Sequence, residues 1–397
     1  MKKTLMIIGA GFGQLPAIKI ANEMNLETIV VDKNPDAIGM KIADHAYAVD
    51  VIDIKEVIKV ARKHNIDGVI TMQTDLPVPT VGAVVDALNL KGSGFEVAER
   101  CSNKIKTRVA FKNAGIPQPN FEVVNCLEEA KVAAKKIGFP CIIKSADSSG
   151  SRGVTKINNE SDIDRALYVA FQNTRLDKVL LEEYISGEEI GAQGFSVDGK
   201  CNLVLLHNDT LSTPPYMIPI GHSFPIAGFS PNELKRIELD VMKAVDIIGI
   251  KDGPSNIDLI IDSRNNKVKI IEIGARIGAT CLPELVSYYS GIDWVEQAIK
   301  SSLDLPIDLN YKKKQPVTAF ILQAHKDGIL SSYEIPNEIL NHPNIKELEV
   351  TAKIDNKVNK LRKGTDRIGK IILTANSAKK ADKLALEFIN KIKFYVK

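Results

Sequence analysis

The sequence predicts a mixed fold, in which a doubly wound α/β domain comes first and α+β organisation follows. Three observations support this prediction. The chain has 397 residues, more than one ordinary core accommodates. In roughly the first 95 residues, short apolar runs alternate with helix-like segments, the pattern of a parallel sheet. After that, apolar strands are joined by polar turns, as in antiparallel sheets.

The first domain, residues 1–95, is predicted from alternating strand and helix signals. Residues 4–8 form an apolar run that ends in glycine, typical of a strand buried on both faces. The other expected strands are 28–31 and 68–71, and the expected helices are 16–25, 54–64 and 78–88. The first strand is followed by a glycine turn and the second by Asp32.

The middle of the chain, residues 96–305, is predicted to be a two-lobed α+β module whose mobile lid lobe covers about 112–185. Its helices are expected at 104–114, 128–137 and 231–247, the first two closed by glycine and proline. Its strands are expected at 141–144, 179–183, 191–196, 203–206, 257–261 and 268–273. Residues 306–397 are expected to form a small α+β domain that ends in a helix over 378–392.

Composition excludes several classes of protein. Basic residues number 52 and acidic residues 49, so the net charge of +3 gives no basic surface of the kind that nucleic-acid binders carry. No apolar stretch approaches the roughly 20 residues that a membrane span needs. The five cysteines are dispersed and form no CxxC pair, which favours reduced thiols and a cytoplasmic protein.

The turn Gly9-Ala10-Gly11-Phe12-Gly13-Gln14 lies between the first strand and helix, where backbone N–H groups can approach an anion. With Asp32 as a ribose acceptor it would suggest an NAD-dependent oxidoreductase, but glutamine stands where the third glycine of that fingerprint belongs. A turn for another ligand, or one that only permits tight packing, fits the residues better.

Lys144 stands at the end of an expected buried strand, and the loop after it is rich in glycine and serine. Such a loop suits the wrapping of phosphate oxygens, although it lacks the GK[ST] of a Walker loop, and a flexible surface turn is the alternative. The strand 179–183 runs into acidic residues up to Glu189. These could meet the base and ribose of a nucleotide, or they could be solvated carboxylates of an edge strand.

Asp258 and Glu272 lie on two apolar strands joined by the polar turn 263–267, which predicts a hairpin with the two carboxylates side by side. Two such carboxylates repel each other unless a cation lies between them, and Mg²⁺ prefers these oxygen ligands together with phosphate. Arg276 follows closely enough to hold a phosphate or an oxyanion. A surface salt-bridge cluster is the alternative interpretation.

In this order, these segments resemble the ATP-grasp superfamily over most of the chain, especially bacterial L-amino-acid ligases and carbamoyl-phosphate-synthase-like ligases. The resemblance implies a pre-ATP-grasp α/β domain, a two-lobed ATP-grasp module and a small C-terminal domain. It implies ATP with Mg²⁺ or Mn²⁺, small-molecule carboxylate and amine substrates, and compatibility with a homodimer. It implies no nucleic-acid or membrane partner.

The resemblance also implies roles for individual residues, including catalytic roles for Arg276 and Lys144. The metal ligands would be Asp258 and Glu272, and the substrate would meet Tyr216, His222 and Arg276. The ATP-binding residues would be Lys104, Lys144, Ser148, Ser149, Gly150, Ser151, Gly153, Glu182, Glu183, Ile185 and Glu189. His222 has an alternative as a structural histidine. The sequence departs from the family pattern Glu-x-Asn at the metal site, where Gly274 replaces the asparagine.

The expected reaction is ADP-forming ligation of a carboxylate to an amine through an acyl phosphate. A carboxylase-type reaction through carboxyphosphate is the alternative within the class. An NAD-dependent oxidoreductase and a non-catalytic nucleotide-binding protein are the alternatives outside it. The identities of the acid and the acceptor are not encoded in any motif of the sequence.

Overall fold

The computed structural model describes residues 2–148, 150, 152–213 and 218–397. The chain divides into two compact units. The first unit comprises Met1–Leu205, Asn232–Gly278 and Val295–Asp308, and the second comprises Leu206–Pro231, Ala279–Trp294 and Leu309–Lys397. The three-domain division expected from the sequence stays a prediction.

The first unit begins with the predicted parallel sheet, whose strand order is β3-β2-β1-β4. Its strands are β1 (Thr4–Ile8), β2 (Glu27–Asp32), β3 (His45–Ala48) and β4 (Gly68–Ile70). Its helices are α1 (Leu15–Glu23), α2 (Ile54–His64) and α3 (Val78–Leu88). All five residues of β1 are buried, because apolar side chains cover both faces of a parallel sheet.

A second sheet of the first unit is antiparallel, with the strand order β5-β8-β6-β7. It consists of β5 (Phe121–Val124), β6 (Cys141–Ser145), β7 (Val154–Ile157) and β8 (Val179–Glu183). Helices α6 (Leu127–Ile137) and α7 (Ile163–Phe171) pack on one face of it and share its apolar core. The opposite face is therefore left for other groups.

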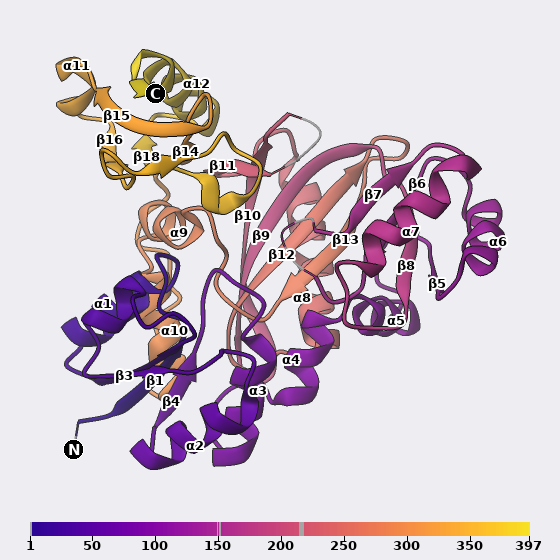
Figure 1. Cartoon of the computed structure of the whole chain (residues 1–397), viewed down its shortest axis with the longest axis horizontal. Coiled ribbons are helices and arrows are strands. Elements are labelled where there is room, and N and C mark those ends of the chain that lie inside the picture. The colour runs from indigo at the N-terminus through magenta and orange to yellow at the C-terminus, as the bar shows by residue number, and fades with distance from the viewer. Residues whose placement is uncertain (1, 149, 151, 214–217) are drawn as a thin grey trace. The chain divides into compact units, whose positions relative to one another are not determined.

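The third sheet region of the first unit has the neighbouring strands β13, β12, β9 and the start of β10 (Figure 1). These are β9 (Gly187–Val197), β10 (Lys200–Leu211), β12 (Gly253–Asp262) and β13 (Lys267–Gly274). The remaining helices that lie wholly or mainly in this unit are α4 (Phe95–Ser102), α5 (Lys104–Ala114), α8 (Pro231–Ile248) and α10 (Trp294–Ser302). The α4 helix was not expected from the sequence.

The second unit contains the continuation of β10 beside β11, then β14, β18 and β16. A smaller sheet has the order β17-β15-β19, and helix α12 packs on the core formed with β14 and β18. Its strands are β11 (Pro219–Phe224), β14 (Val317–Leu322), β15 (Gly328–Glu334), β16 (Ile345–Val350), β17 (Lys357–Val358), β18 (Gly369–Thr374) and β19 (Lys393–Val396). Its helices are α9 (Leu282–Ser290), α11 (Asn337–Leu340) and α12 (Ala378–Lys391).

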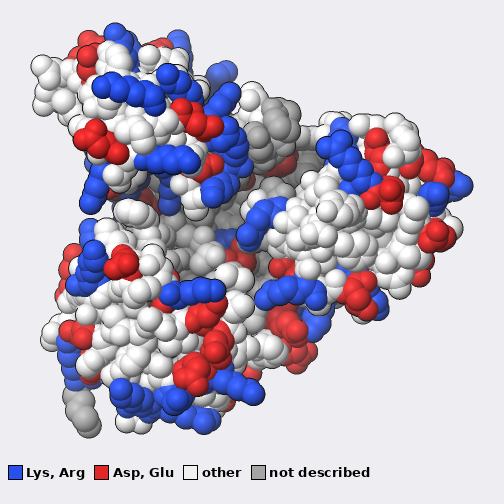
Figure 2. All heavy atoms as spheres, in the orientation of Figure 1, with Lys and Arg blue, Asp and Glu red and all other residues white. Residues whose placement is uncertain are grey.

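The surface carries both signs of charge. On the face drawn in Figure 2, Lys and Arg side chains are interspersed with Asp and Glu, in line with the near-balance of 52 basic and 49 acidic residues. Among the described helices, none combines the length and apolarity that crossing a bilayer requires.

Candidate active site

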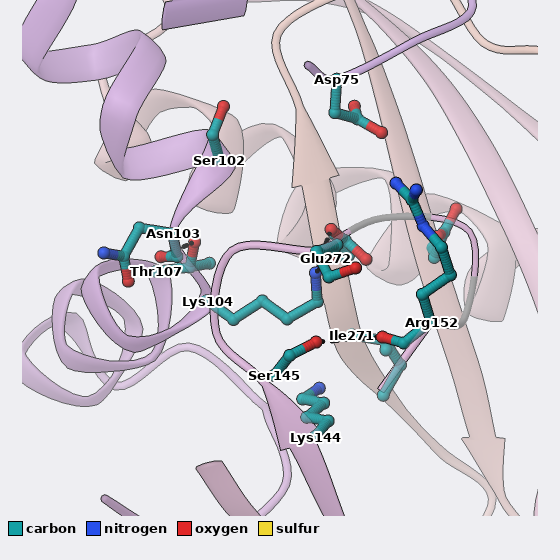
Figure 3. Close-up of polar contacts among 12 residues, drawn as sticks. Asp75, Ser102, Asn103, Lys104, Thr107, Lys144, Ser145, Arg152, Ile271 and Glu272 are labelled. Carbon is teal, nitrogen blue, oxygen red and sulfur yellow. Dashed lines mark hydrogen bonds and ion pairs between the residues drawn. The ribbon is translucent and has the colours of Figure 1, made fainter. Parts of the chain in front are cut away.

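Lys104 is the first residue of α5, and its position is set by a helix cap. The side chain of Asn103 accepts hydrogen bonds from the backbone N–H groups of Ile105 and Lys106, as an N-cap asparagine does. The Lys104 side chain is buried, and its Nζ donates to Glu272 Oε1 at 2.8 Å (Figure 3). The same Nζ donates to the Ser148 carbonyl at 2.6 Å. Burial alone would lower the pKa of Lys104, but the Glu272 carboxylate outweighs it and the pKa is raised.

Lys144 and Glu182 lie on the face of the antiparallel sheet opposite its helices. They occupy diagonal positions on β6 and β8, and Lys144 Nζ is 2.6 Å from Glu182 Oε2. Arg108 of α5 donates to Glu182 Oε1 at 2.6 Å, so the buried carboxylate is shared by two cations. Burial, with repulsion from Arg108 and Lys104, lowers the pKa of Lys144 to about 8 against the attraction of Glu182.

The predicted carboxylate pair on the β12–β13 hairpin is confirmed. Asp258 and Glu272 are direct cross-strand partners, so their side chains leave the same face of the sheet. Asp258 is exposed and Glu272 is half-buried. Glu272 is also the carboxylate that holds Lys104, so the hairpin and the start of α5 meet at one site.

Arg276 follows the hairpin and forms a two-point ion pair with Asp75. Its Nε lies 2.8 Å from one carboxylate oxygen and a terminal nitrogen lies 3.1 Å from the other. Burial opposes both charges, but the pairing outweighs it, so the pKa of Arg276 is raised and that of Asp75 is lowered. A Cβ placed on Gly274 would lie 3.0 Å from Asp75 Oδ1, so the missing side chain makes room for this pair.

The loop after β6 is partly described. The Ser148 carbonyl accepts from Lys104, and Gly150 and Gly153 both adopt positive φ angles, +65° and +72°. A Cβ on Gly153 would also lie 2.7 Å from Ser145 Oγ, so glycine is required there for two reasons. The predicted residues Ser149 and Ser151 lie outside the described residues.

In the segment predicted to meet the nucleotide base, the carboxylates of Glu182 and Glu183 form ion pairs within the protein. Glu182 is held by Arg108 and Lys144, and Glu183 pairs with Arg264 and with Lys269 at 3.2 Å. Ile185 is buried, whereas Glu189 is exposed at the start of β9. The side chains of Glu182 and Glu183 therefore fix the strand, while its backbone groups and Glu189 remain the elements proposed to contact the nucleotide.

His222 lies in the second unit, on β11. Asp209 Oδ1 is 2.6 Å from His222 Nδ1 and 2.7 Å from His207 Nδ1, with both rings buried. Two ligands about 2.1 Å from a common tetrahedral ion would lie roughly 3.4 Å apart, so these shorter contacts are hydrogen bonds. The imidazoles lower the pKa of Asp209 against the effect of burial. Tyr216, the other residue predicted from this segment, lies outside the described residues.

In the glycine turn after β1, two backbone N–H groups donate hydrogen bonds to the side chains of Asp32 and Gln14. Asp32 accepts from the Ala10 N–H at 2.7 Å, and Gln14 Oε1 accepts from the Gly11 N–H at 3.1 Å. Gln14 also donates to the Met72 carbonyl at 2.6 Å. The Asp32 carboxylate and the backbone N–H groups of Ala10 and Gly11 are groups that a dinucleotide would use, and here they form hydrogen bonds within the turn.

Several residues of the site were missed from the sequence. Arg108 lies one helical turn after Lys104, and this i, i+4 spacing on one helix face was a usable signal. Asp75, 201 residues from Arg276, left no local signal. Asn256 lies next to Asp258 on the same face of β12, and alternation along the strand would have placed it there.

Two protein-family models match this chain, and together they cover most of its middle and C-terminal parts. The model of the family "Carbamoyl-phosphate synthase L chain, ATP binding domain" matches residues 103–309, and "L-amino acid ligase C-terminal domain 2" matches residues 320–397. A formate-dependent phosphoribosylglycinamide formyltransferase from Methanocella arvoryzae is 24% identical over 417 aligned positions, covering 98% of this chain and 92% of that one.

Two solved structures are similar over the whole chain. A phosphoribosylglycinamide synthetase from Anaerococcus prevotii has a TM-score of 0.84 and 27% identity, covering 100% of both chains. An L-amino acid ligase from Bacillus licheniformis has a TM-score of 0.85 and 19% identity, covering 100% of this chain and 99% of that one.

The fold and these matches define an ATP-grasp enzyme of the carboxylate–amine ligase class, which forms carbon–nitrogen bonds with release of ADP. The chain belongs to the family of the carbamoyl-phosphate synthase L chain, ATP binding domain, whose model matches more than half of it. ATP and Mg²⁺ are the general requirement of this class, and its substrates are small molecules.

Proposed function

We propose that this enzyme joins a small carboxylic acid to an amine through an acyl phosphate, with release of ADP and phosphate. The observation that carries the proposal is the contact between Lys104 Nζ and Glu272 Oε1 at 2.8 Å. It brings a lysine that we propose to bind phosphate next to the carboxylate pair of the hairpin, and these two features are far apart in the sequence. Charge neutralisation at one point is most of what phosphoryl transfer requires from a protein.

The nucleotide would lie between the face that carries Lys144 and the hairpin that carries Asp258. Lys104 and Lys144 would contact its phosphates, with the loop of Ser148, Gly150 and Gly153 over them. The predicted loop residues Ser149 and Ser151 belong to the same proposal. Backbone groups around Glu182, Glu183 and Ile185 would meet the base, and Glu189 would meet the ribose. The buried Arg108–Glu182 pair supports this arrangement because it fixes the strand from which these groups project.

Asp258 and Glu272 fit a magnesium site by their chemistry. Two carboxylates held opposite each other on neighbouring strands supply hard oxygen ligands from a rigid support. A bound Mg²⁺ would neutralise charge on the phosphate oxygens during transfer. Mn²⁺ would be accepted by the same oxygen donors.

The remaining chemistry falls to positively charged groups. The substrate carboxylate would attack the terminal phosphoryl group, and the resulting acyl phosphate would be attacked by the amine. Arg276 would stabilise the oxyanion, since its guanidinium is fixed by Asp75 and stays charged. Closure of the loop over the phosphates would exclude water from the acyl phosphate.

Substrate selection is proposed to involve the second unit. His222 is held in one orientation by Asp209, which suits a hydrogen bond of fixed direction from its other ring nitrogen. Tyr216 is proposed for the same role. The match of residues 320–397 to an L-amino acid ligase domain supports an amino acid as one of the two substrates. A cytoplasmic location, consistent with the free cysteines, and a homodimer complete the proposal.

The test is ADP formation across a matrix of amino acids and small carboxylic acids, each with and without an added amine. We expect ADP release that depends on both an acid and an amine, and loss of at least a hundredfold in Glu272→Ala. ADP formation that requires bicarbonate instead of an organic acid would favour the carboxyphosphate reaction. Wild-type turnover in Glu272→Ala would contradict the metal assignment.

A further inference from the structure

Asp258 accepts a hydrogen bond from the last of two side-chain amides that lie on the same face of the sheet. Three neighbouring strands contribute, and Figure 1 shows β9, β12 and β13 side by side. Gln193, Asn256 and Gly274 form one cross-strand row. The next row on the same face, two residues along, is Gly191, Asp258 and Glu272. The amide row therefore borders the carboxylate row.

In this series of hydrogen bonds, donor and acceptor follow the same order at every step. The Gly278 N–H donates to Gln193 Oε1 at 3.3 Å, and Gln193 Nε2 donates to Asn256 Oδ1 at 2.8 Å. Asn256 Nδ2 then donates to Asp258 Oδ1 at 3.1 Å. Each amide accepts at its oxygen and donates at its nitrogen, so the series ends on a carboxylate, which can only accept when ionised.

The orientation of Gln193 cannot be reversed without loss. Its Nε2 donates to both the Ala192 carbonyl at 3.0 Å and Asn256 Oδ1, so both N–H groups are used, and its side chain is fully buried. A flipped amide would face the Gly278 N–H with its own N–H groups. The buried amide therefore dictates that Asn256 presents its N–H to Asp258.

Position 274 cannot supply this amide. It is a glycine in direct register with Asn256, and the space beside it is filled by Asp75, whose Oδ1 would be 3.0 Å from a Cβ. The amide of this row thus comes from β12. Gly278, whose N–H begins this series of hydrogen bonds, lies two residues after Arg276. The series therefore connects the segment that follows Arg276 to the Asp258 carboxylate.

We propose that Gln193 and Asn256 form an amide relay that positions Asp258 for the divalent cation. Asn256 and Gln193 are positioning residues, and the inference rests on the proposed role of Asp258 as a metal ligand. Groups that orient a ligand from behind typically affect metal affinity by about 10- to 100-fold when they are removed.

The experiment measures ADP binding by calorimetry, without a divalent cation and in a Mg²⁺ titration. For Asn256→Ala we expect about a tenfold higher Mg²⁺ concentration at half-effect, with metal-free ADP affinity unchanged within twofold. Asn202→Ala, an exposed strand asparagine on β10, is the matched control and should behave as the wild type.

Gln193→Glu separates a relay from a direct contact. A carboxylate at 193 accepts from Gly278 but cannot donate to Asn256, so the Asn256 amide would turn its oxygen toward Asp258. We expect a Mg²⁺ defect similar to that of Asn256→Ala, although the β9 residue opposite Asp258 is Gly191 and not residue 193. If Gln193→Glu fails to fold, Gln193→Met replaces it, because it also lacks the donor to Asn256, and a Mg²⁺ defect is expected there too. Unchanged Mg²⁺ dependence in a folded residue-193 variant would overturn the relay.

Unchanged Mg²⁺ dependence in Asn256→Ala would overturn the relay, and so would an equal loss of metal-free ADP binding. The proposed function fails in a different way. In that case wild-type ADP binding would show no Mg²⁺ dependence, or Glu272→Ala would match the wild type in the same titration.

Discussion

At the scale of single residues, the site is a set of buried charges that balance one another. Glu182 is almost fully buried and accepts from Arg108 and Lys144, whose charges lower its pKa to about 2 against the effect of burial. An unpaired charge at this depth would be strongly unfavourable. One carboxylate against two cations leaves a local excess of positive charge, which suits the binding of polyphosphate.

This balance predicts a pH dependence of nucleotide binding. Because the pKa of Lys144 is lowered to about 8, its ammonium group loses its proton as pH rises through that value. Lys104 keeps its charge, since Glu272 raises its pKa. We expect metal-free ADP affinity to fall by up to about tenfold between pH 7 and pH 9, following the protonated fraction of Lys144.

Calorimetry at several pH values measures this dependence. Lys144→Arg is the control, because a guanidinium remains protonated throughout this range, and its affinity profile should be nearly flat. An equally steep decline in Lys144→Arg would assign the titration to another group.

At the scale of secondary-structure elements, the start of α5 links the stability of the helix to the position of Lys104 in the proposed phosphate site. The Asn103 cap holds the first turn, and the Lys104 N–H donates to the Ala146 carbonyl at 2.8 Å, beside the glycine-rich loop. The helix closes at Gly115, with a φ of +67°. Local sequence signals therefore define both ends of α5, and the capped first turn fixes the position of Lys104.

Asn103→Ala should lower the free energy of unfolding by about 1 kcal/mol, because two backbone N–H groups lose their acceptor. It should also weaken ADP binding, since Lys104 is the first helical residue. Urea unfolding and calorimetry measure the two effects. Asn103→Ser keeps a capping oxygen and should retain most of both, so equal loss in the serine variant would contradict the capping argument.

At the scale of the whole molecule, the charged residues Lys104, Lys144, Glu182 and Glu272 lie within the first unit. His222 and Asp209 lie in the second unit. Ligand binding to the folded state raises its stability by about 2.7 kcal/mol at a hundredfold excess over the dissociation constant. We expect MgADP to raise the thermal unfolding midpoint of the first unit. NADH at the same concentration should leave it unchanged, because Asp32 and Gln14 already bind the glycine turn.

Differential scanning calorimetry tests this prediction, with Glu272→Ala as the variant in which the Mg²⁺-dependent part of the shift is lost. A shift produced by NADH and not by MgADP would restore the oxidoreductase alternative. A shift of equal size with MgADP in Glu272→Ala would remove the carboxylate from the metal site.

Much of the fold could be predicted because its signals are local. The helices at 54–64, 78–88 and 104–114 and the strand at 179–183 begin and end where the sequence predicts, at caps, glycines and changes of periodicity. The pairing of Asp258 with Glu272 also followed from the sequence, because a short polar turn fixes the register of a hairpin. Other elements, such as α4 and β3, were not predicted, because their residues show no clear helical or strand periodicity that sets them apart from the neighbouring loops.

What the sequence determined by itself is the set of elements and the chemical types at their ends: lysines, paired carboxylates and a glycine-rich loop. Only the tertiary structure decided which side chains meet. Asp75 with Arg276, Arg108 with Glu182, and Gln193 with Asn256 are partners separated by 201, 74 and 63 residues. Such pairings depend on how the strands and helices pack, and no local periodicity records them.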